Sequence, residues 1–163
     1  MHAGPVIIGF DGTPASVAAV HEAGALLAPR DALVVVVWEA GRTFEMATLP
    51  ERGLDAPGNL DLPAAFEAEH AASDAAQQLA EHGAALATQA GLKAEGLAVA
   101  DEVTVPDALI RLARERDAAA VVVGGHLHRG LSKLVHGSTL TGLLREAPCP
   151  VLVCGGAQTG GSA

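Results

Sequence analysis

The clearest chemical signal in this chain is a glycine-containing, basic segment at residues 121–139. It begins as an apolar run, breaks at Gly124 and Gly125, and ends in Gly137, Ser138 and Thr139 ahead of a leucine-rich stretch, which predicts a buried strand, a loop and a helix start. The whole chain carries 19 acids against 10 bases, yet residues 118–145 contain no carboxylate. Their charged and titratable side chains are His126, His128, Arg129, Lys133, His136 and Arg145. Since a loop before a helix N-terminus directs N–H groups at one point, we predict a nucleotide phosphate site; the alternative is an ordinary connection with a solvated basic loop.

Other chemistries are weaker in this sequence. No Walker A pattern is present, and no Gly-x-Gly-x-x-Gly follows the first strand, where a dinucleotide site needs it. Ser138 has no acid nearby in sequence for a hydrolytic relay, although distant residues can supply one. His126 and His128 can share a metal, but no carboxylate or cysteine close in sequence completes the shell. We therefore expect no catalytic residue and no metal site.

These residues depend on an alternation of strands and helices. Continuous apolar runs predict buried strands, and apolar residues at helical spacing predict helices between them. The strands are expected at 5–10, 32–38, 92–100, 119–123 and 150–154, and the helices at 14–28, 63–90, 105–116 and 138–147. The strand at 92–100 is less apolar and is expected near an edge. Right-handed crossovers make this a doubly wound α/β domain, in which the loops after Phe10, Trp38 and Val123 meet beyond the carboxyl ends of the strands.

We expect one domain over residues 1–154. Residues 39–62 contain glycines and prolines without a clear period. Two interpretations stay open for this loop, a lid or mobile segment and a tolerated surface insertion. Residues 155–163 are rich in glycine and are expected to form a flexible tail.

Composition limits the classes of partner. The formal net charge of −9 argues against nucleic acid and against an anionic membrane surface, although a local basic pocket remains compatible with it. No apolar run is long enough to span a membrane, and we expect no signal peptide before the first strand. Half of the residues are hydrophobic but only 2% are aromatic, so the core is expected to consist of Ala, Val and Leu. Cys149 and Cys154 are expected on opposite faces of one strand, as free thiols in a reducing cytoplasm.

With these elements in place, the chain resembles the universal stress protein family. The family pattern is a glycine, two residues, a glycine, nine residues, and a glycine followed by Ser or Thr, set between the fourth strand and the last helix. The matching positions are Gly124, Leu127, Gly137 and Ser138. Residues 7–16, 108–124 and 147–153 are also typical of the family. The resemblance covers nearly the whole chain apart from the tail and residues 39–62.

The resemblance implies a five-stranded parallel sheet in the order 3-2-1-4-5, an adenine-nucleotide α-hydrolase-like fold. It also implies a homodimer, commonly paired through the last strands. Some members of the family bind ATP and others do not. In the binders, Asp11 matches a residue at the adenosine end, and Trp38 stands where the backbone of an apolar residue faces the adenine. The nucleotide-binding set implied for this chain is Gly9, Asp11, Trp38, Gly124, Gly125, Leu127, Gly137, Ser138 and Thr139.

Three of these positions have a second interpretation. Asp11 either contacts a ribose or adenine edge, which we favour, or is a turn residue at a helix entry that needs no ligand. Trp38 either packs against a base or fills the core. Leu127 stands where the family has its second glycine, and a leucine there blocks close approach of the chain to a phosphate and disfavours a positive φ. Gly125 lies two residues away, and Arg129 or Lys133 can supply charge instead.

We interpret the chain as a cytoplasmic, dimeric universal stress protein that binds ATP, with Mg²⁺ as a candidate companion ion. Its expected role is regulatory: the nucleotide orders residues 39–62 and changes the surface shown to a partner. AMP or cyclic AMP satisfies the same adenine contacts. The alternative is a nucleotide-free dimerising stress protein that acts through protein contacts, which Leu127 favours. A third hypothesis is a slow nucleotide hydrolase.

Overall fold

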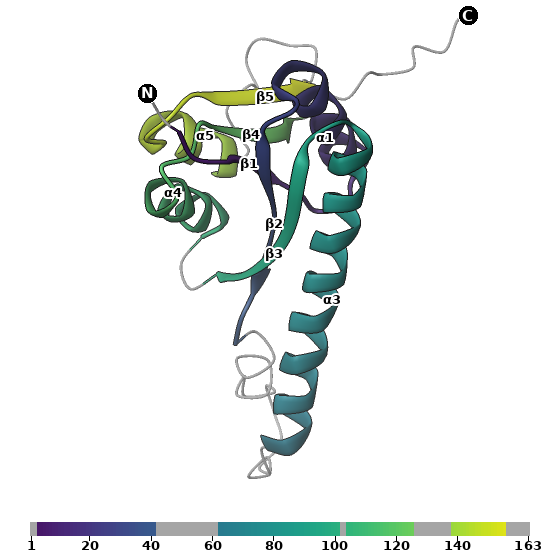
Figure 1. The fold of residues 1–163 in the computed structure, drawn as a ribbon. Coiled ribbons are helices and arrows are strands. Elements are labelled where there is room, and N and C mark those ends of the chain that lie inside the picture. The colour runs from purple at the N-terminus through teal and green to yellow at the C-terminus, as the bar shows by residue number, and fades with distance from the viewer. Residues whose placement is uncertain (1–2, 42–61, 102–103, 126–137, 156–163) are drawn as a thin grey trace, which may run out of the picture.

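The computed structural model describes residues 3–41, 62–101, 104–125 and 138–155 (Figure 1). Strands and helices alternate along these residues, as the sequence predicts, with small shifts at their ends. The elements are β1 (Val6–Gly9), α1 (Pro14–Leu27), β2 (Asp31–Glu39), α3 (Leu62–Gln89), β3 (Lys93–Asp101), α4 (Val105–Glu115), β4 (Ala120–Gly125), α5 (Ser138–Glu146) and β5 (Val151–Gly155).

The strands form a single parallel sheet in the order β3-β2-β1-β4-β5, which confirms the predicted order. β1 lies at its centre, where Ile8 is in register with Val34 of β2 and Val122 of β4. β3 lies at one edge, as its less apolar sequence predicts. Because all the strands are parallel, the carboxyl ends of β1, β2 and β4 meet at the same end of the sheet.

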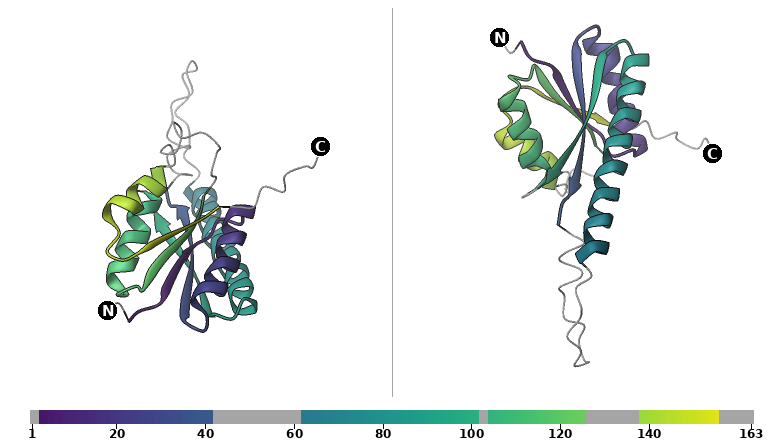
Figure 2. Two further views of the ribbon diagram at one scale, coloured as in Figure 1. Left: turned by 90° about the horizontal axis from the view of Figure 1, so that it is seen from above. Right: turned by 60° about the horizontal axis from the view of Figure 1, so that its bottom comes forward.

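Two helical layers cover the sheet: α1 and α3 lie on one face, and α4 and α5 lie on the other (Figures 1 and 2). Side chains of β2 alternate between the two cores, because successive residues of a strand point to opposite faces. Val34 and Val36 pack in the core beneath α1 and α3, whereas Val35 packs with Leu109 and Leu143 beneath α4 and α5. Alanine supplies much of the helical contribution to the first core, as the composition predicts.

Threonine caps begin α1 and α4, two of the helices that follow a strand at the carboxyl end of the sheet. The Thr13 Oγ1 accepts a hydrogen bond from the Ser16 N–H of α1 at 3.3 Å, and the Thr104 Oγ1 accepts one from the Asp107 N–H of α4 at the same distance. A proline stands in the first turn of each helix, where its missing N–H costs nothing. The local sequence therefore fixes where α1 and α4 start, beside the predicted ligand edge.

The long helix α3 approaches the sheet closely at Gly83. A Cβ at this position would lie 2.8 Å from both the Phe10 Cδ1 and the Val34 Cγ1. A glycine within a helix costs about 1 kcal/mol relative to alanine, so the close packing explains its presence. Residues 42–61, which include most of the predicted lid or insertion, and residues 156–163 of the predicted tail lie outside the described residues.

Both cysteines are free, and they lie on opposite faces of the sheet as predicted. Cys149 packs against the core beneath α4 and α5, and Cys154 belongs to the core beneath α1 and α3. Among the helices of the described residues, none has the length and apolar character that crossing a membrane requires.

Candidate functional site

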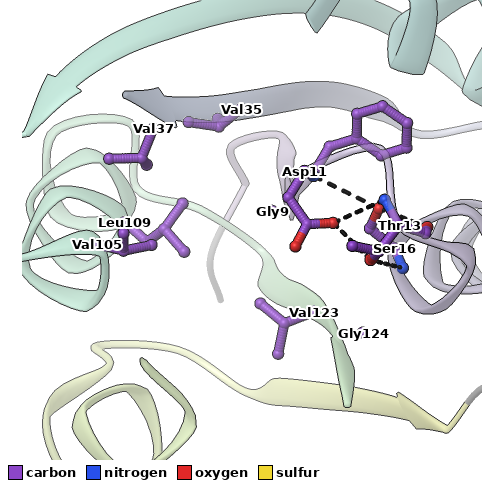
Figure 3. Close-up of a pocket in the computed structure, with 11 residues that line it drawn as sticks. Gly9, Asp11, Thr13, Ser16, Val35, Val37, Val105, Leu109, Val123 and Gly124 are labelled. Atoms are coloured by element: carbon purple, nitrogen blue, oxygen red, sulfur yellow. Dashed lines mark hydrogen bonds between the residues drawn. The ribbon is translucent and has the colours of Figure 1, made fainter. Parts of the chain in front are cut away.

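A cavity of about 290 Å³ opens at the carboxyl ends of β1, β2 and β4 (Figure 3). Its volume is close to the lower end of the range for ligand pockets, about 300 Å³. The residues that line it come from the three strands, the start of α1 and the first turns of α4. They are Gly9, Phe10, Asp11, Thr13, Ser16, Val35, Val37, Val105, Leu109, Val123 and Gly124. The site therefore lies where a doubly wound sheet is expected to bind a ligand.

Asp11 supplies the carboxylate of the cavity, and Thr13 holds it in place. The Thr13 N–H donates to the Asp11 Oδ1 at 3.0 Å, and the Thr13 hydroxyl donates to the same oxygen at 2.6 Å. Both hydrogen bonds end on Oδ1, and Figure 3 shows the other carboxylate oxygen directed toward the cavity. A ligand that donates a hydrogen bond to Asp11 would therefore meet an oxygen that the turn does not use.

Ser16 joins the two ends of this turn from a buried position, with 4% of its surface exposed. Its hydroxyl donates to the Thr13 carbonyl oxygen at 2.9 Å and accepts from the Asp11 N–H at 3.4 Å. Burial of Asp11 raises its pKa, but hydrogen bonds from Thr13, with smaller contributions from Ser16 and the backbone, lower it, and the net pKa lies below the ordinary value of 3.8. The carboxylate is therefore ionised at neutral pH.

The rest of the cavity wall is apolar. Val35 and Val37 lie two residues apart on the same face of β2, Val105 and Leu109 lie one turn apart on α4, and Val123 comes from β4. Figure 3 shows these side chains around an open space with Asp11 at one side. Such a wall suits the face of a flat, uncharged ring, and Asp11 suits a hydrogen-bond donor at the ring's edge.

Two glycines bring the backbone close to its neighbours at this site. A Cβ at Gly9 would lie 3.2 Å from the Val123 Cγ1 and 3.5 Å from the Leu109 Cδ1, so the missing side chain leaves part of the cavity open. A Cβ at Gly124 would lie 2.4 Å from the carbonyl carbon and oxygen of Ala15. Gly124 is therefore required for α1 to pack against β4, whether or not a ligand is bound.

The structure brings some of the predicted site residues together at the cavity and places others elsewhere. Gly9, Asp11 and Gly124 line the cavity together. The side chain of Trp38 packs against the core beneath α1 and α3, and Val37 lines the cavity in its place. Gly125 ends β4, where a Cβ would lie 2.8 Å from the Val153 Cγ1 of β5.

The remaining predicted positions lie at or beyond the limits of the described residues. Ser138 and Thr139 begin α5. Leu127, Gly137 and the histidines at 126, 128 and 136 lie outside the described residues. Within the described ranges, no group of three or more His, Cys, Asp or Glu side chains is placed to hold a metal ion.

The prediction from sequence missed the apolar wall and the two hydroxyl side chains of the turn. A signal for both was present. Successive residues of β2 point to opposite faces of the sheet, so Val35 and Val37 lie on the face opposite Val34 and Val36. Ser16 stands three residues after Thr13, at the spacing of a helix N-cap partner.

Comparison with known proteins yields a family and a set of similar structures. The model of the universal stress protein family matches residues 3–155. A protein of this family from Burkholderia pseudomallei is 24% identical, with a TM-score of 0.63, and the match covers 94% of this chain and 96% of that chain. A universal stress protein in complex with cAMP is 21% identical, with a TM-score of 0.62 and coverage of 96% and 100%. A family member from Arabidopsis thaliana with AMP bound is 13% identical, with a TM-score of 0.59 and coverage of 98% and 97%. No curated protein shows significant similarity to the chain.

Proposed function

The chain belongs to the universal stress protein family, and we propose that it binds an adenine nucleotide in the cavity beside Asp11 as a regulatory stress-response module. The observation that carries this proposal is an apolar slot with one carboxylate at its side. A purine has apolar faces and hydrogen-bond groups along its edge. The adenine amino group or a ribose hydroxyl would donate to Asp11 while Val37 and Leu109 contact the ring.

The charge of Asp11 sets the direction in which the nucleotide lies. An ionised carboxylate repels a phosphate, so the adenosine end occupies the cavity and the phosphates point away from Asp11. We assign the phosphates to the segment from Gly124 to Thr139, including Gly125 and Gly137. This assignment rests on the sequence, because a glycine-containing loop before the N-terminus of α5 favours an anion.

We propose ATP as the physiological ligand, with Mg²⁺ as its companion. Two of the similar structures are described with cAMP or AMP, which share adenosine and one phosphate with ATP. Since the described residues contain no cluster of metal ligands, Mg²⁺ would bind mainly through the phosphates of the nucleotide. We also propose a homodimer paired through β5, which forms an edge of the sheet, and a cytoplasmic location, which suits two free thiols.

A second candidate is a nucleotide-free stress protein that acts through protein contacts. One observation favours it: the packing of α1 against β4 explains Gly124 without any phosphate. The most prominent glycine of the family pattern is therefore compatible with both functions, and binding has to be measured directly.

The test is a calorimetric titration of the nucleotide-stripped protein with AMP, cAMP and Mg-ATP. The variant Asp11→Ala removes the carboxylate of the cavity, and Asp31→Ala removes an exposed carboxylate at the amino end of β2 as a control of equal charge. We expect the parent and Asp31→Ala to bind with the same affinity. Asp11→Ala should bind at least about tenfold more weakly, because a hydrogen bond to a charged group contributes about 1.5 kcal/mol or more.

Equal binding by all three proteins would contradict the assigned role of Asp11. Absence of binding in the parent, with all three nucleotides, would contradict the proposed function and favour the nucleotide-free alternative.

A further inference from the structure

The outer edge of β3 carries an unusual contact with the helix that covers it. β3 has β2 on one side and no strand of the described sheet on the other. α3 runs beside it along most of its length (Figures 1 and 2). An open strand edge presents unpaired N–H and C=O groups, which can pair with an extended segment of another chain.

Gln77 of α3 reaches this edge and bonds to its backbone twice. The Gln77 Nε2 donates to the Gly96 carbonyl oxygen at 3.3 Å, and the Ala98 N–H donates to the Gln77 Oε1 at 3.0 Å. In a parallel pair, a residue of the neighbouring strand that lies beside Leu97 would make the same two bonds. Its N–H would donate to the Gly96 carbonyl oxygen, and its carbonyl oxygen would accept from the Ala98 N–H. The side-chain amide of Gln77 therefore takes the place of one residue of a sixth strand beside Leu97.

Glu81 fixes the orientation of this amide. The Gln77 Nε2 also donates to the Glu81 Oε1 at 3.1 Å, one turn further along α3. An ionised carboxylate only accepts hydrogen bonds, so the nitrogen of the amide has to face Glu81. Both N–H groups of Gln77 are then used, and its oxygen faces the Ala98 N–H.

Gly96 allows α3 to lie close enough for this contact. A Cβ at Gly96 would lie 2.5 Å from the carbonyl carbon of Ala80 and 2.6 Å from its oxygen. Ala80 is itself fully buried. Gly96 and Ala80 are both small, so α3 lies directly against β3 at Ala80, three residues after Gln77.

We propose that the outer edge of β3 is a strand-pairing surface, which Gln77 keeps closed to a second copy of this chain. A second copy fits the edge because a two-fold antiparallel pairing centred on Leu97 is self-complementary. It would set Gly96 of one copy opposite Ala98 of the other, so each Gly96 carbonyl would accept from an Ala98 N–H. These are the two groups that Gln77 occupies, and the two pairings exclude each other.

The test compares Gln77→Ala with Gln78→Ala, its exposed neighbour of the same residue type. Alanine favours a helix at both positions, so both variants should fold. At a protein concentration low enough to keep Gln77→Ala monomeric, hydrogen exchange at the Ala98 amide should be at least about fivefold faster in this variant than in Gln78→Ala, the change expected for the loss of one hydrogen bond worth about 1 kcal/mol. The Leu97 and Val99 amides should be unchanged, since successive amides of a strand alternate and these two face β2. Sedimentation velocity should show an additional, concentration-dependent larger species for Gln77→Ala only.

A second variant, Gln77→Glu, tests whether occupation of the β3 edge by a polar side chain prevents strand pairing. It keeps an acceptor for the Ala98 N–H and adds a charge, which also discourages strand pairing at an edge, so it should not form the larger species. Unchanged exchange at Ala98 in Gln77→Ala would overturn the proposal. Faster exchange at the Ala98 amide without a larger species in sedimentation would overturn the proposal that Gln77 prevents pairing with a second copy. Gln77 would then be a local contact between α3 and β3.

Discussion

The Thr13 hydroxyl lies 2.6 Å from the Asp11 Oδ1, and the same hydroxyl oxygen accepts from the Ser16 N–H as the cap of α1. One side chain therefore both starts the helix and orients the carboxylate at the cavity. This coupling explains how a short turn holds the Asp11 carboxylate in a defined geometry. It also means that the ionisation of Asp11 and the start of α1 respond to the same substitutions.

Replacing Thr13 with valine should raise the pKa of Asp11. Burial raises this pKa in the native protein and the bonds from Thr13 lower it, so the loss of the hydroxyl leaves burial less opposed. A carboxyl with a lowered native pKa stabilises the fold above its unfolded pKa, and this contribution disappears as the pH falls through the native pKa. The pH-dependent part of the loss in Thr13→Val should therefore be present at neutral pH and vanish in acid.

The measurement is a carbon NMR titration of the Asp11 carboxyl, beside urea denaturation at several pH values. Thr13→Ser keeps the hydroxyl and serves as the matched control. Loss of the cap in Thr13→Val should also cost about 1 kcal/mol at every pH. The same Asp11 midpoint in Thr13→Val and Thr13→Ser would contradict the role assigned to the hydroxyl.

Gly124→Ala should destabilise the protein even without nucleotide. The new Cβ would lie 2.4 Å from the backbone of Ala15, so α1 or β4 has to move, and overpacking of this kind costs about 1–3 kcal/mol. At the neighbouring Gly125, the new Cβ would meet the side-chain Val153 Cγ1 at 2.8 Å, which can shift more easily than backbone. Urea denaturation of the nucleotide-free proteins should therefore rank Gly124→Ala below Gly125→Ala in stability. Equal stabilities would show that the packing of α1 does not require Gly124.

Both thiols should react slowly with an alkylating reagent in the folded protein. Burial, and secondly the charge of Asp117, raises the pKa of Cys149 above its ordinary 9.0, and burial with the charge of Glu22 does the same for Cys154. Thiolates are disfavoured in the fold, so stability should fall as the pH rises from about 9 through the native pKa values. Mass spectrometry after iodoacetamide treatment at pH 8 should show slower modification of both cysteines than in urea. Equal rates in the folded and unfolded protein would contradict this prediction.

The sequence predicted the sheet because its signals are local and repeated. Continuous valines mark β2 and β4 as buried on both faces, and the weaker apolar character of residues 92–100 marks β3 as an edge. Asp11 and Gly124 are predicted to lie near a ligand because they stand where such runs end, and both line the cavity. A continuous apolar run such as β2 does not indicate which of its residues face which side of the sheet. Trp38 attracts attention as the one tryptophan, but β2 presents Val35 and Val37 to the cavity.

Contacts between distant segments could not be predicted from the sequence. Nothing near Gln77 in sequence indicates that it bonds to Gly96 and Ala98, because the distance depends on how α3 packs against β3. The same holds for Gly124, where only a glycine leaves room for the backbone of Ala15 in α1. The positions of Leu127 and Gly137 in a phosphate site remain predictions.

The most direct test of the account is methyl NMR of the valine and leucine side chains during titration with AMP. The proposal predicts that the signals of Val35, Val37, Val105, Leu109 and Val123 shift together and saturate. Val34 and Val36 serve as internal controls, because they belong to the same strand and face the other core. Shifts confined to other residues, or no shift at saturating AMP, would contradict the claim that an adenine nucleotide binds in this cavity.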